Sequence, residues 1–395
     1  MLKKVKMLFI SFLLILGILL LDNLMIDTVA SANTQVNVQS EGMRPANKSN
    51  NKIMQQIINQ HTKGVTTLYF PKGTYSFTAG AVILHSNLIL NFASGASFNI
   101  DNGHFFAFAY PSPRKGYNGG INNVQWNNAT FTGSSRNGQS SFTQSMNHAQ
   151  NISFNNCTFY NCENPYGHNL DIDGSRNITV QGSSFVGFNG DRNNEYKEAI
   201  QIDYADRYAM SYYVKNDQYD DLPTYNVHVS NNRFLPIWDG QKIRTYAPNP
   251  IGEHITYQDG RTGVINHIYF IGNEVVDSRP RQTDTVGTIN FDGVSDLTIA
   301  NNRFLNVRAT GPSNYIRIYN PLKNYKMGYV YITRNEFLNI NPTQQYIYVK
   351  SNFPSNVIKK VFISGNIIIS GNTNIPFINS GKNQVIQNGN QSLDI

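Results

Sequence analysis

The chain has 395 residues, of which 14% are charged, and a formal net charge of +7 at pH 7. No basic run with interleaved aromatic residues is present, which argues against a nucleic-acid partner. A mildly basic chain of low charge density instead favours an acidic polysaccharide or an anionic cell wall as its partner.

The first 32 residues predict an export signal. Three lysines precede the apolar run 7–21, and small residues at positions 30 and 32 fit a signal-peptidase site. The apolar run is short for a membrane span, which needs about 20 residues; an uncleaved N-terminal anchor is the alternative. We therefore expect residues 1–32 to be a signal peptide. The mature domain, residues 33–395, is expected to be secreted, from a Gram-positive bacterium, without stable membrane association.

The beginning of the mature chain predicts a cap. Residues 52–61 have the apolar spacing of a short amphipathic helix, and residues 67–77 read as a strand, a turn and a second strand. Farther on, the only two cysteines, Cys157 and Cys162, are too few for a disulfide framework. We interpret them as small core residues or as one local bridge rather than as metal ligands.

One short pattern, apolar-x-apolar-x-(Gly/Asn)-x-x-apolar, recurs along the chain. It is found at 123–131, 151–159, 177–185, 226–234, 267–275, 296–304, 329–337 and 360–368. Its period-two alternation predicts strands, and the Asn and Gly residues predict turns. Because a single coil cannot bury its apolar face but stacked coils share a core, we predict an all-β, single-stranded parallel β-helix with hydrogen-bonded ladders of Asn at equivalent turns. An antiparallel β-sandwich is the rival fold, and it would need hairpin turns.

Two spacings between repeats, 49 and 41 residues, are longer than the others. They predict loop insertions near 189–222 and near 236–263, both rich in charge and aromatic residues. Long loops on a rigid scaffold often carry function, although plain solvated loops would look the same.

A second alternating segment follows in each unit, at 169–173, 199–203, 254–257, 288–292, 315–319 and 346–350. The apolar residues of these segments should point inward and the residues between them outward. In aligned coils one outward column would read Asp171, Gln201, Thr256, Asn290, Arg317 and Tyr348, and its neighbour would read Asp173, Asp203, Asp292, Tyr319 and Lys350. Carboxylates, amides, cations and Tyr rings in one strip suit a sugar chain; the alternative is a polar face that only keeps the sheet soluble.

At this point the sequence resembles the secreted right-handed β-helix enzymes of the pectin-lyase-like group, above all the polygalacturonase type of glycoside hydrolase. FPKGTYSF (70–77) is similar to the group's opening strand, and NLDIDGSRNITV to the stretch with its first catalytic Asp. The resemblance places His168 at that Asp and Asp171 at the next one. It places Lys197 and Glu198 at the family's paired-Asp positions, so that only Glu198 keeps a carboxylate.

The last two motifs match in part. IGEH (251–254) supplies His254 where the family has a His, and NYIRIYN (314–320) resembles its Arg-Ile-Lys motif with Tyr319 in place of Lys. A complete extra coil, the one with Asn290, separates His254 from Arg317, which departs from the family pattern.

These residues and the resemblance lead to a hypothesis of glycoside hydrolysis without a cofactor, a reaction that needs two carboxyl groups around the scissile bond. Asp203 or Glu198 would donate the proton, Asp171 with Asp173 would hold the water, and His254 would orient the acid. Inversion of configuration is implied by the resemblance. Residues expected to contact the polysaccharide are His168, Gln201, Asn290, Asp292, Arg317, Tyr319 and Tyr348.

Two alternatives use the same scaffold. A polysaccharide lyase would take Arg317, Tyr319 or Lys350 as base and could hold Ca²⁺ in the Asp cluster. A non-catalytic glycan-binding adhesin or spike would keep its effect when the carboxylates are replaced by amides. The sequence leaves open the sugar, the linkage and the oligomeric state.

Overall fold

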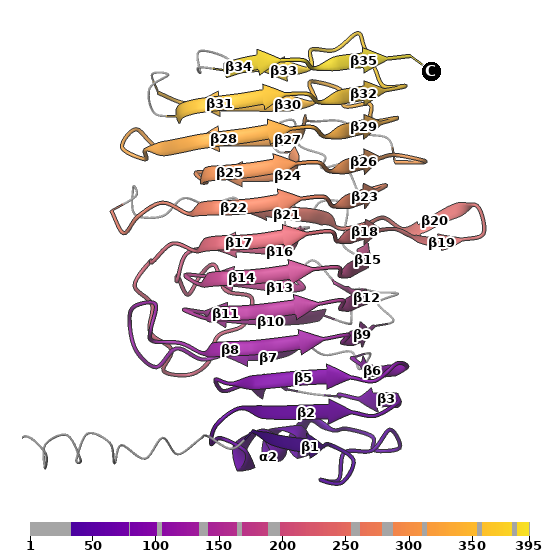
Figure 1. Ribbon diagram of the computed structural model, residues 1–395, viewed down its shortest axis with the longest axis vertical. Helices are drawn as coiled ribbons and strands as arrows, with labels where there is room; N and C mark the ends of the chain where they lie inside the picture. The colour runs from indigo at the N-terminus through magenta and orange to yellow at the C-terminus, as the bar shows by residue number, and fades with distance from the viewer. Residues whose placement is uncertain are drawn as a thin grey trace, which may run out of the picture.

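The computed structural model describes residues 33–78, 80–100, 105–133, 141–163, 168–188, 198–253, 261–278, 287–309, 314–353, 358–380 and 385–394. Within these ranges the chain winds into a right-handed parallel β-helix whose coils stack along one long axis (Figure 1). The fold predicted from the repeat is therefore confirmed. The expected signal peptide, residues 1–32, lies outside the described residues.

Three parallel sheets run the length of the coil, with neighbouring strands contributed by successive turns of the chain. Sheet A contains β1 (Thr34–Asn37), β2 (Thr66–Phe70), β5 (Leu88–Phe92), β8 (Asn122–Asn127), β11 (Gln150–Asn155), β14 (Arg176–Gln181), β17 (Tyr225–Ser230), β22 (Asn266–Ile271), β25 (Ser295–Ala300), β28 (Met327–Thr333), β31 (Ile358–Ser364) and β34 (Val385–Asn388). Sheet B contains β3 (Gly73–Ser76), β6 (Ala96–Asn99), β9 (Thr130–Thr132), β12 (Thr158–Glu163), β15 (Ser184–Phe188), β18 (Arg233–Leu235), β23 (Glu274–Val276), β26 (Arg303–Leu305), β29 (Glu336–Leu338), β32 (Ile367–Ile369) and β35 (Gln391–Leu393).

Sheet C carries the candidate site. It contains β4 (Val82–Ile83), β7 (Phe105–Tyr110), β10 (Ser141–Asn147), β13 (Leu170–Asp173), β16 (Glu198–Asp203), β21 (Asn249–Glu253), β24 (Gly287–Asp292), β27 (Asn314–Asn320), β30 (Ile347–Ser351) and β33 (Ile378–Asn379).

A helix closes the N-terminal end of the coil, as predicted. Helix α2 (Asn51–Gln60) buries Met54, Ile57 and Ile58, which belong to the same continuous core as the strands. It is the only α-helix in the described part of the chain, and no described helix is long and apolar enough to cross a bilayer.

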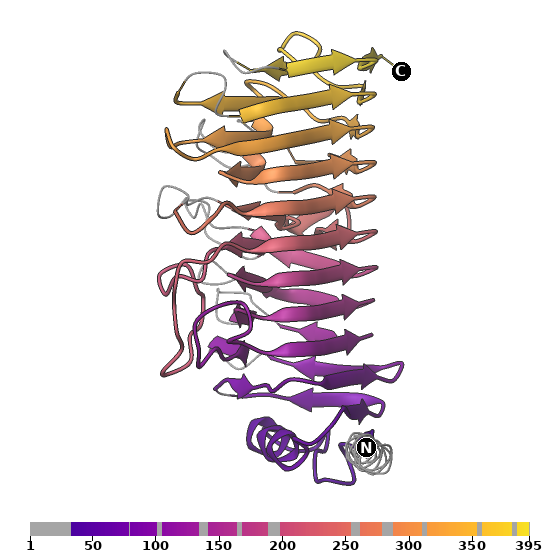
Figure 2. The same ribbon diagram turned by 60° about the vertical axis from the view of Figure 1, so that its left-hand side comes forward.

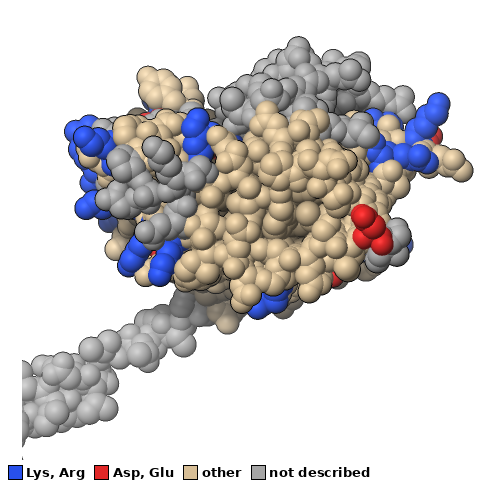
Figure 3. Space-filling model, turned by 90° about the horizontal axis from the view of Figure 1, so that it is seen from above, with Lys and Arg blue, Asp and Glu red and all other residues tan. Residues whose placement is uncertain are grey.

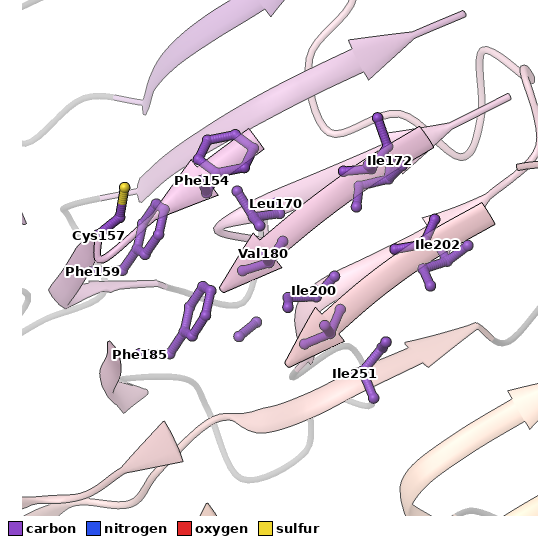
Figure 4. Packing of buried hydrophobic residues seen from close by; sticks show 14 of the residues in the cluster. Phe154, Cys157, Phe159, Leu170, Ile172, Val180, Phe185, Ile200, Ile202 and Ile251 are labelled. Atoms are coloured by element: carbon purple, nitrogen blue, oxygen red, sulfur yellow. The ribbon is translucent and has the colours of Figure 1, made fainter. Parts of the chain in front are cut away.

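The interior is filled by columns of equivalent side chains from successive coils. The apolar residues that end the repeat stack on one another: the ring centroids of Phe159 and Phe185 are 4.8 Å apart, and those of Phe185 and Phe234 are 4.9 Å apart. Figure 4 shows Phe159 and Phe185 beside the aliphatic side chains of sheet C. Cys157 and Cys162 are both buried thiols, not joined to each other.

Asparagine forms the predicted ladder at the turn from sheet A to sheet B. The side-chain amide of Asn302 donates to the Phe270 carbonyl at 2.9 Å and to Asn335 Oδ1 at 2.9 Å, and the backbone NH of Asn302 donates to the same Asn335 oxygen at 3.1 Å. The same bonds link Asn232, Asn273, Asn302, Asn335, Asn366 and Asn390. Each coil thereby satisfies buried backbone groups that would otherwise cost free energy.

Two long connections leave the coil near the regions where insertions were expected. Residues 204–224, which we call the strap, run back over the preceding coils of sheet C, beside the connection from β7 to β8 (Figure 2). Residues 237–245 form an antiparallel hairpin of β19 (Ile237–Asp239) and β20 (Lys242–Thr245), which projects from the right-hand side in Figure 1. Residues 189–197 and 254–260 of these insertions lie outside the described residues.

Candidate functional site

In sheet C the residues of the two outward columns pair with the neighbours on adjacent strands that we expected. The paired residues are Asp171 with Gln201, Asp173 with Asp203, Asn290 with Arg317, Asp292 with Tyr319, Arg317 with Tyr348, and Tyr319 with Lys350. Acids therefore do lie side by side on adjacent coils, about 5 Å apart by the spacing of paired strands.

The middle of the first column differs from the prediction. We expected residues 254–257 to form its strand and Thr256 to continue the column. The strand is instead Asn249–Glu253, and Gly252 is the neighbour of both Gln201 and Asn290. Its Pro and Gly residues obscure the apolar alternation of a strand, which explains the error. His254, our candidate for orienting the acid, lies outside the described residues.

The four candidate catalytic carboxylates are not open to solvent. Asp171, Asp173, Glu198 and Asp203 each have a relative exposure of 0%. Their neighbours in sequence, such as Ile172 and Ile202, fill the coil interior (Figure 4). The predicted alternation is thus correct, but the expectation of a solvent-facing acidic cleft was wrong, because the strap covers this part of the sheet.

The strap is joined to the acid-bearing strands by specific hydrogen bonds. The backbone NH of Ser211 donates to Asp171 Oδ2. One strand earlier, Ser145 Oγ donates to the Tyr212 carbonyl, and the Asn147 side chain donates to the Gln218 carbonyl at 3.0 Å. Side chains of β10 and β13 that face away from the core are thereby used to bind the chain's own backbone.

A second set of contacts anchors the strap at its far side. His148 Nε2 lies 2.6 Å from Asp220 Oδ1, and His148 Nδ1 lies 2.6 Å from Ser112 Oγ. The other Asp220 oxygen accepts the Gly116 NH at 2.7 Å, and Asp217 accepts the Ser112 NH at 2.8 Å. These residues were missed from the sequence, because nothing in the spacing of His148 and Asp220 reveals that the loop folds back.

Within the covered cluster the carboxylates have different environments. Asp203 accepts bonds from Gln201 Nε2 at 3.0 Å and from the Tyr204 NH at 2.8 Å. Neither oxygen of Asp173 has a hydrogen-bond partner among the described residues. Burial, reinforced by the nearby carboxylates of Asp171 and Asp203, raises the pKa of Asp173 well above its usual value. Asp173 therefore favours the protonated form.

Two of the residues that the resemblance places at family catalytic positions, His168 and Glu198, have structural contacts. His168 is buried, and its Nδ1 lies 2.7 Å from the backbone carbonyl of Glu198. The Glu198 side chain extends over Gly252, where an added Cβ would lie 2.7 Å from Glu198 Cγ. His168 thus positions the start of β16 rather than facing a substrate, and Gly252 provides the space that Glu198 occupies.

The C-terminal part of the same columns is arranged differently. Arg317 Nη1 forms an ion pair with Asp292 and donates to Asn290 Oδ1 at 2.9 Å. Its guanidinium lies 4.3 Å from the centroid of the Tyr319 ring, and Lys350 Nζ lies 5.6 Å from that ring. Asp292, Tyr319 and Tyr348 are partly exposed and Lys350 is exposed, so this strip reaches solvent.

A buried carboxyl group that the sequence did not suggest lies between these two regions. Glu253 has an exposure of 0%, and its Oε2 accepts the Asp292 NH at 2.9 Å. The hydroxyl groups of Tyr204 and Tyr325 bond to each other nearby, and burial raises the pKa of both above its usual value. No group of three or more His, Cys, Asp or Glu side chains in the described ranges is placed to hold a metal ion, and we assign no ion to the Asp cluster.

Comparison with known proteins supports the architecture. No protein-family model matches the chain, and no curated protein matches it. The surface adhesin PfbA of Streptococcus pneumoniae superposes with a TM-score of 0.64 at 18% identity over 92% of each chain. A second structure of that adhesin superposes with a TM-score of 0.56 at 16% identity, over 91% of this chain and 97% of the adhesin.

An exopolygalacturonase from Thermotoga maritima also matches, with a TM-score of 0.50 at 11% identity over 91% of each chain. At these identities the likeness shows a parallel β-helix and no more. An adhesin and a hydrolase share this architecture, so the function has to be argued from the surface of this chain.

Proposed function

We propose that the protein is an exported, non-catalytic glycan-binding protein of a bacterial surface. Its binding strip would be the open C-terminal part of sheet C, made of Asp292, Tyr319, Tyr348 and Lys350, with the largely buried Arg317 against the Tyr319 ring. The observation that carries this proposal is the complete burial of Asp171, Asp173, Glu198 and Asp203, while Asp292, Tyr319, Tyr348 and Lys350 of the same columns reach solvent.

A hydrolase would require a different arrangement of the acids. Two carboxyl groups must flank the scissile bond of a sugar chain, with room for water between them in an inverting enzyme. Here the space above Asp171 is occupied by the backbone of Ser211, and Asp203 is engaged by Gln201 and by its own chain. A glycan could reach these groups only if the strap left the sheet.

The open strip has the chemistry that binding needs. Tyr side chains offer apolar ring surface together with a polar hydroxyl. Arg317 is largely buried, and Asp292 and Asn290 hold it against the Tyr319 ring, so little side-chain entropy remains to be lost when that ring contacts a ligand. The exposed ammonium of Lys350 adds positive charge beside Tyr319.

The test is binding of the mature protein to a panel of bacterial and plant polysaccharides, with analysis of product chain length in the same samples. Tyr319→Ala and Tyr348→Ala should weaken binding, whereas Asp171→Asn and Asp203→Asn should leave it unchanged. Tyr69→Ala, at an exposed tyrosine of the second coil, is the matched control. Shortened glycan chains that disappear in Asp203→Asn would contradict the proposal and support the hydrolase; unsaturated products would support the lyase.

A further inference from the structure

The outward face of sheet A changes its chemistry along the axis. One column of directly paired residues has no aromatic side chain up to Thr179 and carries several from His228 onward. In order along the axis it reads Gln35, Thr67, Ile89, Gln125, Ser153, Thr179, His228, Tyr269, Thr298, Tyr331, Phe362 and Ile386. A sheet face that only had to remain soluble would not need aromatic residues in its second half, since the first half manages without them.

The aromatic side chains of this column form two stacks. The rings of His228 and Tyr269 have centroids 4.4 Å apart and are inclined by 16°. The rings of Tyr331 and Phe362 have centroids 4.9 Å apart and are inclined by 5°. Each stack is thus a pair of rings that face each other along the column.

Thr298 separates the two stacks. It is the direct strand neighbour of both Tyr269 and Tyr331, and its short side chain is partly exposed. Two strand spacings separate the tyrosines, which corresponds to about 9.5 Å. A sugar ring placed between the two tyrosines would lie about 4 Å from each phenol ring when in van der Waals contact. The two contacts together need about 8 Å, so one saturated six-membered ring fits between the tyrosines above Thr298.

Positive charge lies beside this gap. Lys359 Nζ is 4.6 Å from the ring of Tyr329, which in turn lies 6.3 Å from the ring of Tyr331. Lys360 is the strand neighbour of Tyr329. Asp296, the acidic residue one strand earlier, accepts bonds from Ser295 Oγ and the Tyr329 NH. Its carboxylate is therefore partly engaged by its own chain.

The C-terminal part of the chain, to which this gap belongs, is also positively charged. Residues 287–395 contain ten Lys and Arg but four Asp and Glu, a net charge of +6 out of +7 for the whole chain. Seen along the axis, Lys and Arg side chains gather at the left-hand side in Figure 3, where β28 and β31 begin in Figure 1. A negatively charged polymer would be attracted to this side of the molecule.

We propose that the gap at Thr298 binds one pyranose ring of an anionic polysaccharide between Tyr269 and Tyr331. The apolar faces of the sugar would contact the two phenol rings, and Lys359 or Lys360 would pair with its carboxylate or sulfate group. This rests on the proposed glycan-binding function but concerns a second surface, on sheet A rather than sheet C. A nucleic acid is a poorer occupant, because the gap admits a single ring and no row of free aromatic faces follows it for successive bases.

Thr298→Tyr tests the gap directly. The new ring would fill the space between the two stacks and complete the aromatic column, so the protein should fold and the sugar should be excluded. Thr179→Tyr adds the same side chain to the same column outside the gap and is the matched control. Lys359→Glu tests the charge, with Lys52→Glu on helix α2, also exposed, as its control.

The measurement is titration calorimetry with a heparin hexasaccharide and a polygalacturonate hexamer, with cellohexaose as neutral probe, after a melting curve has shown that each variant is folded. We expect an anionic probe to bind the wild type, and Thr298→Tyr and Lys359→Glu each to weaken its affinity about tenfold or more, with both controls unchanged. Preference for the neutral probe, or a folded Thr298→Tyr variant with wild-type affinity, would overturn the inference. If only Tyr319→Ala and Tyr348→Ala reduce binding, the inference fails while the proposed function stands; if no probe binds the wild type, both fail.

Discussion

The two halves of sheet C share the same strands, the same register and the same two outward columns, yet their surfaces differ. In the first half the columns carry carboxylates with 0% exposure beneath the strap. In the second half they carry Tyr319, Tyr348 and Lys350, which reach solvent. The coil determines which side chains point outward, and the length and path of the connections determine which of them a ligand can reach.

The comparison also separates two uses of polar residues. Beneath the strap, Ser145, Asn147 and Asp171 hydrogen-bond to the chain's own backbone. In the open half, Asn290 and Asp292 hold the largely buried side chain of Arg317 against the partly exposed Tyr319 ring. Residues of one chemical kind thus stabilise the fold in one region and prepare a binding surface in the other.

The largest effect on the difference between the two halves is expected when the strap is released from the sheet. Asp220→Ala removes a carboxylate that contacts His148 and the Gly116 NH. We expect a loss of about 2–4 kcal/mol in the free energy of unfolding, because the fully buried His148 ring and the Gly116 NH both lose a hydrogen-bond partner. Urea unfolding measures this, and trypsin cleavage at the exposed Arg207 and Lys215 should become faster. Lys215→Ala, on the solvent side of the strap, should leave stability unchanged; an equally stable Asp220→Ala variant would show that the strap does not depend on this contact.

A substitution in the Asn ladder, which both halves share, should reduce the free energy of unfolding by less than Asp220→Ala does. It should also leave the strap in place. Asn302→Ala removes the amide bonds to the Phe270 carbonyl and to Asn335. Because a backbone carbonyl is left buried, we expect a loss of about 2 kcal/mol. Chemical denaturation measures it, and the rate of trypsin cleavage in the native strap should not change. A cost near zero would mean that water replaces the ladder.

The covered acids provide a pH-dependent test. In an unfolded chain Asp173 would ionise near pH 4, whereas the folded state keeps it protonated to higher pH. The folded state then binds more protons, so this group's contribution to the free energy of unfolding is present below about pH 4 and falls as pH rises through the folded pKa. Asp173→Asn should therefore stabilise the protein at pH 7, by about 1–2 kcal/mol, and make no difference at pH 3.

Asp203→Asn is the comparison for that variant. The Asp203 carboxylate accepts two hydrogen bonds, and an amide can replace only one of its oxygens as an acceptor. We expect it to destabilise the protein at pH 7, opposite in sign to Asp173→Asn. Melting temperatures of both variants between pH 3 and pH 8 decide the matter, and destabilisation by both would mean that Asp173 is ionised in the folded protein.

The smallest effect on stability is expected in the open half. Lys350→Ala removes an exposed cation near Tyr319, and exposed substitutions usually change stability by less than about 0.5 kcal/mol. Glycan affinity should nevertheless fall, which thermal melting together with calorimetric titration can show. A clear loss of stability without a change in affinity would mean that this strip serves the fold rather than a ligand.

The local pattern of the sequence was sufficient to predict the coil. The repeat identified eight strand pairs of sheets A and B, from β8 and β9 to β31 and β32, together with the Asn ladder, because each coil repeats the same inward and outward alternation. The alternation of sheet C was enough to pair Asp171 with Gln201 and Asp173 with Asp203. It failed at β21, where Pro250 and Gly252 interrupt the pattern.

What the amino-acid sequence determined alone was therefore the winding of the chain and the direction of its side chains, since both follow from contacts between equivalent residues of neighbouring coils. Only the tertiary structure decided which outward residues are accessible. The strap is held by pairs such as His148 with Asp220 and Gly116 with Asp220, which lie 72 and 104 residues apart in the sequence. Such contacts occur once and have no period, so a repeat pattern carries no trace of them.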